Sequence, residues 1–266
     1  MIKQINNQLN NEIQYKILRN KIISIVPSQT EFLYDLGLEE EVVGITKFCI
    51  YPEHWFRSKT RIGGTKQLKI DVITELNPDL IIGNKEENER SQIEELQEKF
   101  PVWLSDIVTF EDALNMMRTI GKLVNREVKA NQIVQQIIDK KKNFDLNFTS
   151  NKRLKVAYFI WRKPYMVAAN DTYINEMLRT FGAENIFESK VRYPEIELQD
   201  LKKYDVDAIF LSSEPYPYKK KHLAEFQAAC PNAKVILVDG EAFSWYGSRM
   251  LKAFDYFEVL WGLIRN

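Results

Sequence analysis

The sequence repeats one pattern: a short apolar run followed by an amphipathic stretch, first from about residue 22 and again after residue 150. Apolar runs of this length are typical of buried strands, and the stretches between them have helical spacing. Strands that alternate with helices predict parallel sheets with crossover helices. The two halves also correspond, because NPDLIIGNKE matches DVDAIFLSSE with Asp79 aligned on Asp207. We therefore predict an α/β fold with two similar lobes.

A long amphipathic stretch lies between the two halves, with apolar residues at helical spacing over residues 126–144. We predict an N-terminal α/β lobe over residues 1–125, a single inter-lobe helix over 126–148 and a C-terminal α/β lobe over 149–266. Each lobe would be Rossmann-like, with a parallel central sheet. Because no Pro/Gly-rich linker interrupts the joint, we expect it to be stiff.

Composition excludes several classes of protein. The 37 basic and 37 acidic residues balance, whereas a nucleic-acid-binding protein would show a basic surplus. No run approaches the ~20 apolar residues of a membrane span. Two histidines do not suit a His-rich metal site, and we expect no protein-bound metal. Cys49 and Cys230 lie far apart in the sequence, and whether they pair stays open.

Sequence motifs of common enzymes are absent. The chain has no G-x-G-x-x-G after a strand, no phosphate-binding P-loop and no G-x-S-x-G motif. The Gly63–Gly64 pair predicts a turn rather than a phosphate cradle. His54, in YPEHWF, is expected at the surface or an interface. We therefore predict no catalytic residues and no enzymatic activity.

The segment SIVPSQTEFLYDLG, residues 24–37, predicts a strand, a turn and a helix. Ser28 and Glu31 have the spacing of a capping box, in which each side chain accepts a hydrogen bond from a free amide of the helix start. Such a capped helix start could be an ordinary structural feature of an α/β fold. Alternatively, its positive amino end could face a ligand beyond the carboxyl edge of the sheet.

Aromatic residues lie just after several predicted strands, beside Gly, Ser, Pro and Arg residues. Open α/β sheets bind ligands beyond the carboxyl ends of their strands, in clefts lined by apolar faces and a few polar groups. A core position is the alternative, and we expect it for Tyr158 and Phe159 within their strand. An arginine among these residues would suit a carboxylate, a phosphate or a stacked ring. The candidate cleft residues are Phe48, Tyr51, Trp161, Tyr165, Phe243, Trp245, Tyr246 and Arg249.

Two blocks, RNKIISIVPSQTEFLYDLGLEEEVVGIT and RIGGTKQLKIDVITELNPDLIIGNKEEN, resemble the first lobe of class III substrate-binding proteins of ABC importers. These are the helical-backbone receptors for cobalamin and ferric siderophores. In the second lobe, GAENIF, LSSEPYPYKKKH and DGEAFSWYGSR resemble the cobalamin-binding branch. The similarity extends from about residue 20 to the C-terminus. It implies two α/β lobes bridged by one long helix.

The resemblance also implies a ligand site in the cleft between the lobes, where a large, flat, metal-centred ligand lies between aromatic side chains. The ligand would be a corrinoid such as cobalamin or, alternatively, a ferric siderophore or haem-type iron complex. It would carry its own metal, so no intrinsic cofactor is expected. Thr65 stands where a cobalamin receptor can carry a tryptophan, which leaves the ligand's identity open. By position, the ligand-binding residues would be Phe48, Tyr51, Trp161, Trp245, Tyr246 and Arg249.

In this family one glutamate of each lobe docks onto arginines of the membrane permease. By their matching positions in the internal repeat, these would be Glu86 and Glu214. Alternatively, both glutamates are ordinary solvated charges. The basic run at residues 219–222 is expected to be a solvated helix start. We expect a monomer whose partners are a metal-chelate ligand and the transmembrane subunits of an ABC permease.

The sequence leaves alternatives open for both the cellular location and the function of the protein. The family implies a periplasmic protein, but the polar first 21 residues contain no signal peptide, so a cytoplasmic location is not excluded by sequence. A cytoplasmic enzyme or metallocofactor-handling protein could use the same scaffold, since fold alone does not fix function. A scaffold that binds only a partner protein is a third alternative, and it predicts that the aromatic residues fill their own cleft.

Overall fold

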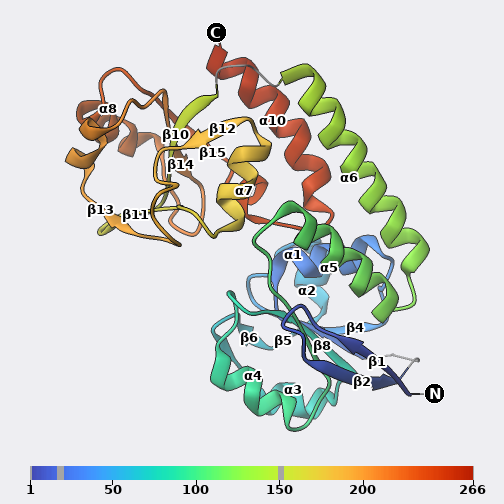
Figure 1. Cartoon of the computed structure of the whole chain (residues 1–266). Helices are drawn as coiled ribbons and strands as arrows, with labels where there is room; N and C mark the ends of the chain where they lie inside the picture. Colours follow the sequence, from blue (N-terminus) through green and yellow to red (C-terminus); the bar gives the residue numbers. More distant parts are fainter. Residues whose placement is uncertain (1, 17–20, 149–152, 266) are drawn as a thin grey trace. The chain divides into compact units, whose positions relative to one another are not determined.

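A computed structural model of the chain describes residues 2–16, 21–148 and 153–265. The chain forms two compact units (Figure 1). Unit 1 comprises Met1–Ile107, Glu111–Gln136 and Tyr246–Arg249, and unit 2 comprises Val108–Phe110, Ile137–Trp245 and Met250–Asn266. The predicted long helix is present as α6 (Glu127–Phe148), and the division between the units falls within it, after Gln136.

Unit 1 is built on a parallel five-stranded sheet of order β5-β4-β3-β8-β9. Figure 1 shows α3 and α4 on one side of this sheet and α1, α2 and α5 on the other. The elements in chain order are β3 (Ile22–Ser24), α1 (Pro27–Asp35), β4 (Val42–Ile45), α2 (Glu53–Ser58), β5 (Thr60–Arg61), β6 (Gly63–Gly64), β7 (Gln67–Leu68), α3 (Ile70–Leu76), β8 (Leu80–Asn84), α4 (Arg90–Gln97), β9 (Val102–Ser105) and α5 (Phe110–Leu123).

Unit 2 has a six-stranded sheet in which β10, β12, β14 and β15 are parallel, whereas β11 and β13 add an antiparallel edge. The sheet is thus mixed at one side, which the repeating pattern does not predict. Its elements are β10 (Leu154–Trp161), β11 (Tyr165–Val167), α7 (Tyr173–Thr180), β12 (Ala183–Asn185), β13 (Glu195–Ile196), the 3-10 helix η1 (Leu198–Lys203), β14 (Ala208–Ser212), the 3-10 helix η2 (Lys220–His222), α8 (Leu223–Ala229), β15 (Lys234–Val238), α9 (Gly240–Ser244) and α10 (Arg249–Arg265).

The predicted internal correspondence is confirmed by the strand order. In unit 1, β3 pairs with β8 and β8 with β9; in unit 2, β10 pairs with β14 and β14 with β15. The aligned aspartates make equivalent main-chain bonds, since Asp79 N donates to Lys21 O (2.8 Å) and Asp207 N donates to Lys155 O (2.9 Å). The loops that follow β8 and β14 are therefore counterparts.

An N-terminal hairpin of β1 (Ile2–Asn6) and β2 (Glu12–Lys16) belongs to unit 1 and was not predicted. Its apolar residues are too sparse for a recognisable strand pattern, although Ile5 and Ile13 pair across it. The side chain of Gln8, in the connecting turn, accepts a hydrogen bond from Asp106 N (3.1 Å) and donates one to Asp112 O (2.9 Å). These bonds fasten the turn to the carboxyl end of β9 and to α5.

Much of the aromatic content packs inside unit 2. Phe181 lies at the centre, with ring centroids of five neighbouring aromatic residues 5.2–6.3 Å away. Phe243 is one of them and is fully buried, so its candidate position in a ligand cleft is wrong. Tyr165 is partly buried and packs against Phe159 and Phe226 at the edge of the core on the opposite face of the sheet. Those five neighbours of Phe181 are Phe144, Phe210, Phe243, Phe257 and Trp261.

Candidate functional site

In unit 1, the loop after β4 presents two exposed aromatic rings. Phe48 is 50% exposed and Tyr51 is 37% exposed, whereas Cys49 between them is fully buried. The Cys49 Sγ atom lies 3.1 Å from both the Thr30 and the Thr46 hydroxyl oxygens. The buried Cys49 side chain therefore anchors the loop to the interior of unit 1, and its neighbours Phe48 and Tyr51 lie at the surface beyond the carboxyl end of β4.

Tyr51 is supported from one side by Arg249, the first residue of α10. The guanidinium carbon lies 4.3 Å from the centroid of the Tyr51 ring, a cation–π distance. Arg249 Nε donates to Glu31 Oε2 at 2.7 Å, and the two side chains are only 11% and 7% exposed. Within unit 1, Arg249 thus pairs with Glu31 of α1 and packs against the Tyr51 ring. Its predicted role as a ligand-binding residue stays a prediction.

The capping-box prediction for Ser28 and Glu31 is wrong. The N-cap of α1 is Val26, no side chain caps the helix, and Pro27 occupies its first turn. The helix therefore begins two residues earlier than predicted, at Pro27, which places Ser28 inside the first turn rather than at the cap. Glu31 instead pairs with Arg249.

Buried polar side chains gather at the carboxyl ends of β8 and β9 and were missed by sequence analysis. Gln29 Nε2 donates to Ser105 Oγ (2.7 Å), and Asn84 Nδ2 donates to the same oxygen (3.0 Å). All three side chains are buried. The sequence does contain an indication of this cluster: Asn84 and Ser105 are polar residues at the ends of otherwise apolar strands.

Tyr246 lies in unit 1 and is only 4% exposed. Its phenol donates to Glu87 Oε1 at 2.9 Å. Burial, and next the Glu87 carboxylate, raise the pKa of Tyr246 well above its usual value, so the phenol keeps its proton at neutral pH. Its role toward a ligand stays a prediction.

In unit 2, the exposed candidate is Trp161, the last residue of β10, which is 40% exposed. Trp245, by contrast, is only 8% exposed. Its indole Nε1 donates to Glu214 Oε1 (2.9 Å), and the same oxygen accepts a bond from the Ser244 hydroxyl (2.6 Å). Glu214 therefore orients Trp245 within unit 2, and the docking role predicted for this glutamate stays a prediction.

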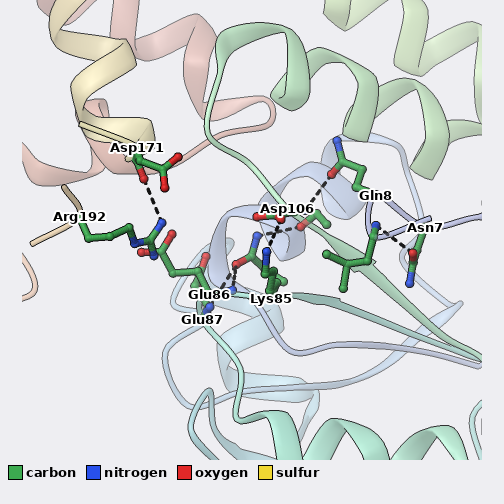
Figure 2. Close-up of polar contacts among 11 residues, drawn as sticks. Asn7, Gln8, Lys85, Glu86, Glu87, Asp106, Asp171 and Arg192 are labelled. Atoms are coloured by element: carbon green, nitrogen blue, oxygen red, sulfur yellow. Dashed lines mark hydrogen bonds and ion pairs between the residues drawn. The ribbon is translucent and has the colours of Figure 1, made fainter. Parts of the chain in front are cut away.

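Glu86, the second predicted docking residue, follows β8 in a tightly bonded loop. Its N–H donates to Asn84 Oδ1 (2.8 Å), and its carbonyl accepts from Lys66 Nζ (2.7 Å). Figure 2 shows the neighbouring Lys85 reaching Asp106, with a distance of 2.6 Å between Nζ and Oδ2. The loop backbone is thus fixed, while Glu86 itself is half-buried.

The turn predicted at the Gly63–Gly64 pair lies just after it: the two glycines form strand β6, and Thr65 and Lys66 make the turn of the β6–β7 hairpin. Gly63 has φ +99°, and a Cβ there would lie 2.3 Å from Gln67 O, so only glycine fits. Among the other residues named from sequence, His54 is at the surface and 3.2 Å from Glu39 Oε2, as expected. His222 is buried, so the basic run at 219–222 is only partly a solvated helix start.

Both cysteines are free, and they differ in accessibility. Burial raises the pKa of the Cys49 thiol, and its hydrogen bonds with Thr30 and Thr46 offset part of this rise.

We expect Ellman's reagent at pH 8 to modify only Cys230 in the native protein and both thiols in urea. Cys230→Ser should abolish the native reaction. Equal rates for both thiols in the native protein would contradict the buried position of Cys49.

The sequence profile of the family described as "Periplasmic binding protein" matches residues 22–231. The chain belongs to this family. Its members are substrate-binding proteins of transport systems rather than enzymes. Among the described residues, no helix is long and apolar enough to span a bilayer, and no group of three or more His, Cys, Asp and Glu side chains could hold a metal ion.

Relatives with this fold differ in the ligand that they are named for. An ABC transporter substrate-binding lipoprotein of Bacillus subtilis, YvrC, is 26% identical over 77% of this chain and 67% of its own length. A vitamin B12-binding protein of Pectobacterium carotovorum is 24% identical over 89% of this chain and 86% of its own. The crystal structure of a periplasmic heme-binding protein from Pseudomonas aeruginosa superposes with a TM-score of 0.78 at 18% identity, covering 92% of this chain and 93% of its own. The two-lobed α/β fold is thereby confirmed.

Proposed function

We propose that this protein is the substrate-binding component of an ABC importer and that its ligand is a corrinoid of the cobalamin type. The observation that carries the proposal is the pair of exposed aromatic surfaces beyond the carboxyl ends of β4 and β10, formed by Phe48 and Tyr51 in unit 1 and by Trp161 in unit 2. Exposed aromatic rings offer flat apolar surface of the kind that ligand sites for large apolar faces use. The vitamin B12-binding relatives support the choice of ligand.

The six candidate residues have different roles in this proposal. Phe48, Tyr51 and Trp161 contact the ligand directly. The buried members, Trp245, Tyr246 and Arg249, border the site and hold its exposed rings and loops in place. A corrinoid brings its own cobalt, so the chain needs to supply only shape, apolar contact and hydrogen bonds.

A haem-type iron complex or a ferric siderophore is the alternative ligand. Haem iron takes axial ligands from the protein, and a tyrosine phenolate is one of them. Tyr51 is 37% exposed and lies on the same loop as the exposed Phe48 ring, which is the specific observation in favour of haem. If haem is the ligand, Tyr51→Phe should change the Soret band of the complex. If a corrinoid is the ligand, the same change should leave the cobalt absorption bands in place.

Tryptophan fluorescence can test the proposal, because Trp161 is the exposed tryptophan of this chain and the other four are buried. We expect cyanocobalamin or cobinamide to quench the emission of micromolar protein with a saturable isotherm. Haemin and a ferric hydroxamate are titrated in parallel to separate the alternatives. Absence of saturable quenching by every one of these compounds would overturn the proposal.

We further propose that the protein acts outside the cytoplasm and docks onto the transmembrane subunits of its importer through Glu86 and Glu214. Charged residues at an interface rim act mainly through orientation and association rate. We expect Glu86→Gln to reduce ligand-stimulated ATPase activity of the reconstituted importer several-fold without changing ligand affinity. Glu89→Gln, at an exposed glutamate of the same loop, is the matched control and should have no effect. Equal activity of the two variants would contradict docking through Glu86.

A further inference from the structure

The ring of Trp161 is exposed, but the residues on both sides of it in the sequence are held firmly. Tyr218 Oη donates to the Trp161 carbonyl oxygen at 2.8 Å. Tyr216 N donates to Ile160 O at 3.3 Å. Arg162 Nε and Nη2 both donate to Glu225 Oε2, at 3.1 and 2.9 Å. The end of β10 is thus fastened at three successive residues to the segment 216–225.

The indole ring itself has a partner in the same segment. The Tyr216 ring lies against Trp161 with a centroid distance of 5.8 Å and an interplanar angle of 68°, an edge-to-face arrangement. Tyr216 in turn contacts the Tyr218 ring at 4.8 Å. One pair of tyrosines therefore holds both the main chain and the side chain of Trp161.

Tyr218 is suited to this role because it is itself immobile. It is only 5% exposed, and its ring packs against Phe226 (5.7 Å) and His222 (5.6 Å). Burial raises the pKa of Tyr218, so its phenol remains a hydrogen-bond donor at neutral pH. The Trp161 carbonyl consequently keeps its partner throughout the pH range in which the protein would work.

An exposed aromatic residue that must be ordered on binding loses conformational entropy, whereas one that is already fixed does not. We infer that Tyr216 and Tyr218 are positioning residues of the ligand site, which hold the Trp161 ring in its binding orientation before the ligand arrives. The inference rests on the proposed function for its effect on affinity. Its structural part, the immobilisation of Trp161, concerns the ligand-free protein alone.

The ligand-free part is tested by time-resolved fluorescence anisotropy. The contribution of Trp161 is identified as the one lost in Trp161→Phe. We expect Tyr216→Leu to add a fast, large-amplitude motion to this contribution, and Tyr218→Phe a smaller one. Tyr216→Phe keeps the ring and should behave as the wild type. Tyr204→Phe, on a half-buried tyrosine that packs against Phe187, controls for the loss of a phenol elsewhere in unit 2.

The effect on affinity is tested with cyanocobalamin, cobinamide and haemin, using calorimetry so that loss of a fluorophore does not matter. We expect Tyr216→Leu to weaken binding about tenfold and Tyr216→Phe to restore it. In a double-mutant cycle, Tyr216→Leu should have no further effect once Trp161 is already alanine, because Tyr216 acts through that ring. If Tyr216→Leu unfolds more easily, the milder Tyr218→Phe completes the same cycle.

The outcomes are distinct. Unchanged affinity of both tyrosine variants, or tenfold losses that add in the double variant, would overturn the positioning role. Failure of the wild-type protein to bind any of the three probes would overturn the proposed function and the effect on affinity with it. The anisotropy of the ligand-free variants separates these two failures, because it would still show whether the tyrosines immobilise Trp161.

Discussion

Replacing Arg249 with methionine is expected to lower the free energy of unfolding by about 3 kcal/mol, because it leaves the Glu31 carboxylate in a buried position without its guanidinium. The two side chains are 11% and 7% exposed, so water cannot replace the lost ion pair. The Tyr51 ring also loses the cation packed against it. Urea unfolding followed by circular dichroism measures the change.

Two controls isolate the effect of burial. Arg90→Met removes an ion pair with Glu94 whose side chains are 89% and 58% exposed, and it should change stability by less than ~0.5 kcal/mol. The double variant Glu31→Gln/Arg249→Met removes both charges and should recover part of the stability lost in Arg249→Met. Equal stability of the Arg249→Met and Arg90→Met variants would show that the Glu31–Arg249 pair is not a buried one.

The fold could be predicted from sequence because its elements obey local patterns. The buried runs at β3, β8, β10 and β14 are continuous and apolar, as expected for strands covered on both faces. Their repetition also predicted the internal correspondence of the two sheets. The hairpin β1–β2 could not be found in this way, because it carries only a few apolar residues, such as the buried Ile13, and the tertiary bonds of Gln8 add to its support.

The capping-box prediction is wrong because Pro27 competes with Ser28 for the start of the helix. Pro27 is well suited to the first turn of a helix, since it has no N–H to satisfy there and its φ is already helical. That preference moves the start of α1 ahead of Ser28. Glu31 then gains more from a buried arginine than from a backbone amide at the helix end. The sequence spacing alone could not indicate this partner, which lies 218 residues away.

The candidate site was predictable in its residue types but not in the exposure of each residue. Phe48, Tyr51 and Trp161 remain at the surface, whereas Phe243 joins the core of unit 2. Trp245 is buried, and Glu214 accepts its indole N–H. That contact joins residues 31 positions apart, and so it follows from tertiary structure rather than from any local pattern.

Replacing Trp161 with alanine is expected to weaken corrinoid binding about 30-fold, the effect of removing an aromatic residue worth ~2 kcal/mol at the centre of an interface. The folded state should hardly change, because the indole is 40% exposed and the hydrogen bond from Tyr218 reaches only the main-chain carbonyl. Isothermal titration calorimetry with cyanocobalamin measures the affinity, and thermal unfolding measures the stability.

The choice of control decides what such a loss means. Leu263→Ala removes a side chain that is 65% exposed on α10, and it should leave the affinity unchanged. Trp161→Phe keeps a flat ring at the end of β10 and should retain most of the affinity, because the proposed contact is with the face of an aromatic system rather than with the indole N–H. If alanine and phenylalanine at position 161 bind equally well, and both as tightly as tryptophan, then the exposed ring of unit 2 is not part of the ligand site.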